Sequence, residues 1–265
     1  MGESIVITSG KGGVGKTTTT ANIGTALALM GQKVCLIDTD IGLRNLDVVL
    51  GLENRIIFNI IDVIEGRCKL QSALVKDKRF ECLHLLPAAQ TSDKNEVSPE
   101  AIAELVEELK PDYDYILIDC PAGIEQGYKN AVAGADKAIV ISTPEKSSIR
   151  DADRIIGLLE QEELKNSPFL IINRIRKHMV DSGDMLSVDE IVSTLSIELL
   201  GIILDDEDVI RSSHHGVPVA FQPDTKASIS YRNIARRILG ESVPLMSLDE
   251  EKGFMTKVKK LLGMK

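Results

Sequence analysis

Two patterns of apolar and polar positions alternate along the chain. Short, almost wholly apolar runs predict strands, and they lie at residues 4–9, 33–40, 82–88, 113–123, 137–143, 169–175 and 200–204. Between them apolar residues recur at helical spacing, most clearly over residues 98–110, 147–165, 187–196 and 227–240. Because the strands are apolar throughout, we expect helices on both of their faces. The pattern predicts one α/β domain over residues 1–240, built on a doubly wound, mostly parallel sheet with helices on both faces.

The end of the chain has a different pattern. Residues 241–250 read as a linker, and residues 251–265 form a short amphipathic segment. At 100° per residue its apolar side chains fall within an arc of about 120°; they are Phe254, Met255, Val258, Leu261 and Leu262. The lysines of the polar side lie outside that arc; they are Lys252, Lys257, Lys259 and Lys260. A basic amphipathic helix of this length is too short to span a bilayer and is typical of an interfacial anchor on an anionic membrane surface. The alternative is a helix that packs its apolar stripe on the main domain.

Charge separates these two parts of the molecule. The chain carries a formal net charge of −9, and because residues 251–265 hold five lysines and one glutamate, residues 1–250 carry −13. An acidic body argues against nucleic acid as a partner. The four cysteines form no C-x-x-C pair and match no zinc spacing. With no signal-like N-terminus, we expect a cytoplasmic protein, and its amphipathic segment predicts peripheral contact with the inner face of the cell membrane.

A glycine-rich loop carries the first candidate chemistry. Residues 10–17, GKGGVGKT, fit G-x-x-x-x-G-K-[ST] between a predicted strand and a predicted helix. The backbone N–H groups of such a loop wrap phosphate oxygens, a lysine adds charge beside the β- and γ-phosphates, and a hydroxyl binds Mg²⁺. The predicted nucleotide-binding residues are therefore Gly10, Lys11, Gly12, Gly13, Val14, Gly15, Lys16, Thr17 and Thr18.

Carboxylates and an amide are expected beside this loop. Three acids stand at the ends of predicted strands, where they meet the loop at one sheet edge: Asp38, Asp40 and Asp119. Together they favour a metal and water site; the alternative for any one of them is a helix N-cap. Asn173 follows a later strand and could bind a base edge or simply cap the strand end. Three residues on, Arg176 cannot accept a hydrogen bond as a guanine-reading aspartate does, so ATP is favoured over GTP.

The extra loop lysine, Lys11, brings a family resemblance. KGGVGKTT, together with DTDIGLRNLDVVLGLENR at 38–55, YILIDCPAGIE at 115–125 and KGFMTKVKKLLG at 252–263, resembles the deviant Walker-A ATPases of the MinD/ParA family over essentially the whole chain. The resemblance implies that Lys11 reaches across an ATP-bound homodimer to the partner's phosphate. It also implies that Asp40 positions the attacking water and that Asp38 and Asp119 lie around the metal. The catalytic candidates are therefore Lys11, Lys16 and Asp40. The candidates at Mg²⁺ are Thr17, Asp38 and Asp119.

The same resemblance implies partners and a cellular role. The LRNLD segment at 43–47, read as a helix, matches a docking surface for a MinC-like division inhibitor, which makes Arg44, Asn45 and Asp47 candidate partner-binding residues; Arg44 could also be a solvated helix charge. The function implied is septum placement by ATP hydrolysis, controlled by a MinE-like or other topological regulator. Alternatives are a flagellar-number regulator, a ParA-like DNA partition ATPase, an iron–sulfur reductase using Cys120, and a non-hydrolysing scaffold.

Overall fold

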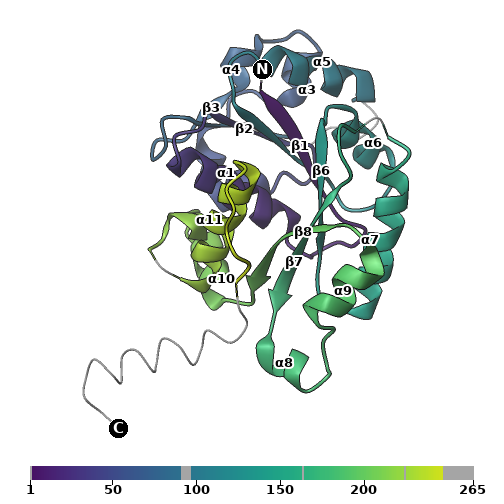
Figure 1. The fold of residues 1–265 in the computed structure, drawn as a ribbon. Helices are drawn as coiled ribbons and strands as arrows, with labels where there is room; N and C mark the ends of the chain where they lie inside the picture. The colour runs from purple at the N-terminus through teal and green to yellow at the C-terminus, as the bar shows by residue number, and fades with distance from the viewer. Residues whose placement is uncertain (1, 91–96, 163, 224, 247–265) are drawn as a thin grey trace, which may run out of the picture.

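A single twisted sheet runs through the middle of the protein (Figure 1). The computed structural model describes residues 2–90, 97–162, 164–223 and 225–246. Within these residues eight strands lie in the order β3-β4-β2-β5-β1-β6-β7-β8, and every neighbouring pair is parallel except β3 with β4. The strands are β1 Glu3–Thr8, β2 Val34–Asp38, β3 Val75–Lys76, β4 Leu83–Leu86, β5 Tyr115–Asp119, β6 Lys137–Ser142, β7 Phe169–Ile175 and β8 Glu198–Leu204. The doubly wound, mostly parallel sheet that the sequence predicts is confirmed.

Helices cover both faces of the sheet and close two separate hydrophobic cores (Figure 1). One core lies under α1 Lys16–Leu29, α2 Leu46–Leu50, α10 Glu207–His214, α11 Lys226–Ile238 and the short η3 Val219–Phe221. The other lies under α3 Ile60–Ile64, α4 Leu70–Ala73, α5 Pro99–Leu109, α6 Gln126–Ala133, α7 Lys146–Leu159 and α9 Val188–Leu195. The short α8 Lys177–Asp181 follows β7, and η1 Glu53–Arg55 follows α2. Coverage on both sides explains why strand residues are apolar at consecutive positions.

The predicted elements differ from the observed ones mainly at their ends. Each predicted strand is present, and α5 begins as expected, with Pro99 in its first turn and the Ser98 hydroxyl accepting from the Ala101 N–H at 3.2 Å. The helix predicted over 147–165 already ends at Leu159 in α7. The helix predicted over 43–47 is wrong for its first three residues, because Arg44 has a left-handed φ of 47° and α2 begins only at Leu46.

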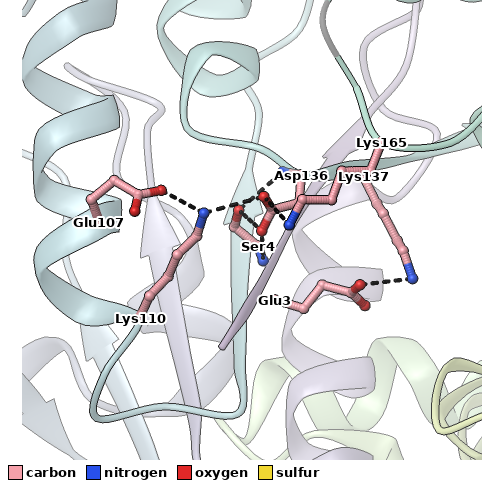
Figure 2. Close-up of polar contacts among 7 residues, drawn as sticks. All are labelled: Glu3, Ser4, Glu107, Lys110, Asp136, Lys137 and Lys165. Atoms are coloured by element: carbon pink, nitrogen blue, oxygen red, sulfur yellow. Dashed lines mark hydrogen bonds and ion pairs between the residues drawn. The ribbon is translucent and has the colours of Figure 1, made fainter. Parts of the chain in front are cut away.

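The amino edge of the sheet is held by a buried carboxylate, shown in Figure 2. Asp136 accepts hydrogen bonds from the Ser4 N–H and hydroxyl, both at 2.9 Å, and from Lys110 Nζ at 3.2 Å, and it forms an ion pair with Lys165 at 2.8 Å. Although burial acts in the opposite direction, these donors hold the pKa of Asp136 well below its usual range. The carboxylate therefore ties β1, the end of α5 and the start of β6 together.

The C-terminal part of the described chain lies back on the body. Residues 241–246 belong to the predicted linker, and Arg237 of α11 donates to the carbonyls of Val243 at 2.9 Å and Pro244 at 2.6 Å. The predicted anchor residues, Phe254, Met255, Lys257, Val258, Lys259, Lys260, Leu261 and Leu262, lie outside the described residues. In the part of the chain that is described, no helix combines the length and apolarity needed to cross a membrane.

Candidate functional site

The glycine-rich loop occupies the carboxyl edge of the sheet, between β1 and α1. Gly13 and Gly15 have φ values of 76° and 100°, left-handed conformations that side-chain-bearing residues rarely adopt. At Gly10 a Cβ atom would lie 2.2 Å from the carbonyl oxygen of Asp151 in α7, so only glycine fits there. Gly12 and Gly13 are exposed whereas Val14 is buried, which leaves the tip of the loop open to a ligand. The half-buried Thr17 and Thr18 follow in the first turn of α1.

The second loop lysine is buried at the base of this loop. The side chain of Lys16 donates to the Ser9 hydroxyl at 2.9 Å, and the residue is only 7 % exposed. Burial lowers the pKa of Lys16, an effect that the neighbouring Cys120, Asp119 and Asp40 oppose. A cation held this way, in a poorly solvated position at a helix N-terminus, is suited to a phosphate group.

Asp119 lies beside Lys16 and carries the candidate metal chemistry. It is buried at the end of β5, accepts from the Thr20 hydroxyl at 3.2 Å and has the Thr17 side chain beside it. Burial, and next the charge of the adjacent Asp38, raise the pKa of Asp119. A divalent cation would relieve the repulsion between these two acids, and a hydroxyl with a carboxylate is an oxygen donor set that suits Mg²⁺.

The remaining ligands of such a cation would have to come from elsewhere. Among the described residues no group of three or more His, Cys, Asp and Glu side chains is arranged to hold a metal ion. Mg²⁺ in nucleotide sites keeps several waters and binds phosphate oxygens through one or two protein groups. The side chains present therefore fit a nucleotide-bound Mg²⁺ better than a metal held by protein alone.

Asp38, predicted beside the metal, organises the main chain after β2. Its Oδ1 accepts from the Asp40 N–H at 2.9 Å, and its Oδ2 accepts from the N–H groups of Asn45 and Leu46 at 3.2 and 3.1 Å. For this acid the capping alternative therefore fits the observed contacts. The bonds fix the backbone of Asp40, the predicted water-positioning residue, at the same edge as the loop.

Lys11 points away from the base of its own loop. Its Nζ lies 3.0 Å from Glu145 Oε2 and donates to the Ser147 hydroxyl at 3.2 Å, both at the start of α7. The side chains of Lys11 and Glu145 are 40 % and 55 % exposed. Sequence reasoning did not identify Glu145 or Ser147, because nothing in the local pattern places the start of α7 beside residue 11.

The predicted partner-binding residues are only partly at the surface. Asn45 is exposed and Arg44 is half-buried, but Asp47 is 1 % exposed and lies beneath them. Arg44 Nε is 2.8 Å from Asp47 Oδ2, an ion pair without good hydrogen-bond geometry. A partner would contact Arg44 and Asn45, whereas Asp47 would contribute only by holding the Arg44 side chain. Leu43, inside the predicted 43–47 segment, is an exposed apolar residue, and so is Val48, which sequence reasoning missed.

A parallel sheet with this loop, a buried lysine and acids at one edge defines a P-loop nucleoside triphosphatase. The second lysine in the loop, Lys11, is the mark of the deviant Walker-A type. A family model described as an AAA domain matches residues 2–171. The septum site-determining protein MinD of Bacillus subtilis is 67 % identical over 267 residues, with 100 % of both chains covered. The chain belongs to the family of MinD septum site-determining ATPases.

Two solved structures are similar to the whole fold. One is the MinC:MinD cell division protein complex of Aquifex aeolicus, at 53 % identity and a TM-score of 0.86, covering 92 % of this chain and 99 % of that one. The other is the Pyrococcus horikoshii MinD complexed with Mg-ADP, at 30 % identity and a TM-score of 0.82, covering 92 % and 100 %. The predicted family, the ATPase activity and the cofactors ATP and Mg²⁺ are thereby confirmed. The flagellar and DNA-partition alternatives are not favoured.

Proposed function

We propose that this protein places the division septum by dimerising on ATP, binding the inner face of the cell membrane and recruiting a division inhibitor. The observation that carries the proposal is the separation of the two loop lysines. Lys16 is buried at the base of the loop, whereas Lys11 is on its outer side and 40 % exposed. A lysine in that position can serve a second subunit without leaving its own site incomplete.

Each residue of the nucleotide site has a proposed role. Residues 10–18 hold the phosphates through backbone N–H groups, and Lys16 adds its charge there. Thr17 and Asp119 are the proposed Mg²⁺-side groups, with Asp38 holding the loop that carries Asp40. Asp40 orients the attacking water. The nucleotide supplies the phosphoryl group and, with its Mg²⁺, part of the charge neutralisation that hydrolysis needs.

Lys11 is proposed to act across the dimer on the phosphate bound by the partner subunit. To do so it must leave Glu145, and an ion pair this exposed contributes only about 0–1 kcal/mol. A second cation beside the transferring phosphoryl group stabilises charge that develops in the transition state. The cost of releasing Lys11 is therefore small compared with what the new contact can supply.

The surface around α2 is the proposed docking site for a MinC-like inhibitor. Arg44 and Asn45 present polar groups there and Asp47 holds Arg44 in place. The Aquifex aeolicus relative, 53 % identical, forms a complex with MinC, which supports the same class of partner here. A MinE-like or other topological regulator would act on the same cycle. Residues 1–250 are strongly acidic, which supports the proposal of no nucleic acid partner.

Membrane binding is proposed for residues 251–265, joined by the 241–250 linker to the 1–240 ATPase domain. Each lysine near an anionic surface contributes on the order of 1 kcal/mol, while ordering the segment costs on the order of 1 kcal/mol per residue. One segment is therefore a marginal anchor. Two on one dimer gain about 10²–10⁴-fold in avidity, so that ATP would favour the membrane and hydrolysis would release the protein to the cytoplasm.

Liposome pelleting of the full chain tests this proposal. Phe254→Glu places a charge in the apolar arc and should abolish ATP-dependent pelleting with anionic liposomes while ATP binding is unchanged. Thr256→Glu is the matched control, because it adds the same charge on the opposite side of the predicted helix and should keep most of the binding. Full pelleting by the Phe254 variant would overturn the anchor.

A further inference from the structure

The strand that carries Asn173 is irregular next to the phosphate loop. β7 and β8 pair at Ile172 with Ile202 and again at Ile175 with Leu204, so that between these two pairs β7 contains one residue more than β8. Arg174, inside this bulge, has a left-handed φ of 59°. Bulges beside functional sites redirect a side chain, and here the redirected side chain is that of Asn173.

Both ends of the Asn173 amide are engaged by the main chain. Its Nδ2 donates to the Val14 carbonyl oxygen at 2.8 Å, and its Oδ1 accepts from the Arg174 N–H at 2.9 Å. The residue is only 6 % exposed. A Cβ atom at Gly15 would lie 2.5 Å from Nδ2, so the amide sits tightly against the underside of the loop.

This contact sets the direction of a loop N–H group. The Val14 carbonyl and the Gly15 N–H belong to one planar trans peptide, in which they point in opposite directions. When Asn173 holds the carbonyl, the Gly15 N–H is turned to the opposite side of the peptide, away from Asn173. Gly13 and Gly15 both have left-handed φ values, so the peptides around Val14 would otherwise turn easily.

We infer that Asn173 is a positioning residue for the phosphate loop, acting on whatever phosphate chain the loop binds. The inference rests on the proposed phosphate-binding role of residues 10–17. Loss of the bond leaves a buried carbonyl without its donor and the loop peptide free to rotate. An interaction of this kind changes affinity by on the order of tenfold.

Binding calorimetry with three ligands tests the inference on the full chain. The ligands are ATP, GTP and inorganic tripolyphosphate, each with Mg²⁺, and tripolyphosphate has no base. Asn173→Ala should raise the Kd of all three by a similar factor, about tenfold. Asn173→Asp keeps an acceptor for the Arg174 N–H but cannot donate to Val14, and it should weaken all three at least as much. Asn130→Ala is the matched control, since Asn130 is 3 % exposed and donates to the Val97 carbonyl at 2.8 Å.

Each outcome decides the question. A loss confined to ATP, with tripolyphosphate unchanged, would show that Asn173 reads the base, and so would a shift of Asn173→Asp toward GTP. Unchanged affinities, or equal losses in the Asn130 control, would also overturn the inference. The Asn130 control, measured with the same three ligands, separates a loss at the phosphate loop from a general loss of stability. If the wild type binds tripolyphosphate but no ATP, the proposed function fails while the role of Asn173 is still measured.

Discussion

Lys11 and Lys16 have different surroundings although one short loop carries both. Lys16 is enclosed among Ser9, Asp119 and Cys120, where its charge is available only to a ligand in its own loop. Lys11 stands outside, held by an exposed ion pair to Glu145. The two lysines therefore cannot substitute for each other, and their variants should fail at different steps of the cycle.

Replacing Lys11 by alanine should separate binding from turnover. We expect Lys11→Ala to lose at least about 10³-fold in single-turnover hydrolysis, the size of effect that a cation supplied in trans gives, while its Kd for ATP changes little. Lys33→Ala, at an exposed position on the amino edge of the sheet, is the control and should hydrolyse ATP normally. Normal hydrolysis by the Lys11 variant would rule out the proposed trans role.

At the scale of the elements, the polar cluster around Asp136 joins the start of β1 to the start of β6. Asp136→Ala should lower the free energy of unfolding by about 3 kcal/mol, because it removes the acceptor of the buried Ser4 N–H and hydroxyl and one of the two carboxylates that pair with the buried Lys110. Glu3→Gln removes the more exposed pair with Lys137 and should cost at most about 1 kcal/mol. Urea unfolding of both variants at neutral pH measures the difference; equal losses would contradict a special role for Asp136.

The contribution of Asp136 should also depend on pH. Its pKa in the folded protein is lower than the ordinary value of about 3.9, so the folded state binds fewer protons and stability rises with pH. The stabilisation is complete above that ordinary value and is lost as the pH falls toward the folded-state pKa. The gap between wild type and Asp136→Ala should therefore narrow below about pH 4.

The sequence predicted the interior of this fold better than its surface. Apolar runs predicted the seven parallel strands because burial on two faces leaves a continuous signal in the chain. β3 was missed since it has only two residues at an antiparallel edge. In the site, the motif predicted a glycine-rich loop between a strand and a helix, and the structure has it between β1 and α1. The directions of Lys11 and Asn173 depend on α7 and on a bulge in β7, which no local pattern encodes.

At the scale of the whole molecule, the two edges of the sheet carry different groups. Its carboxyl edge carries the loop, the acids and the exposed Lys11, and its amino edge carries the stabilising cluster around Asp136 (Figures 1 and 2). Chemistry and stability thus depend on different groups. A single copy holds every proposed nucleotide contact except the second lysine on the phosphate, which makes dimerisation the central claim.

Light scattering during size-exclusion chromatography of Asp40→Ala tests that claim most directly. Without the carboxylate that is proposed to position the attacking water, bound ATP should persist and trap the dimer. We expect the 28.9 kDa chain to elute at its monomer mass with ADP or no nucleotide and at twice that mass with ATP and Mg²⁺. A monomer mass in saturating ATP, with binding of the nucleotide verified in the same sample, would contradict an ATP-dependent dimer.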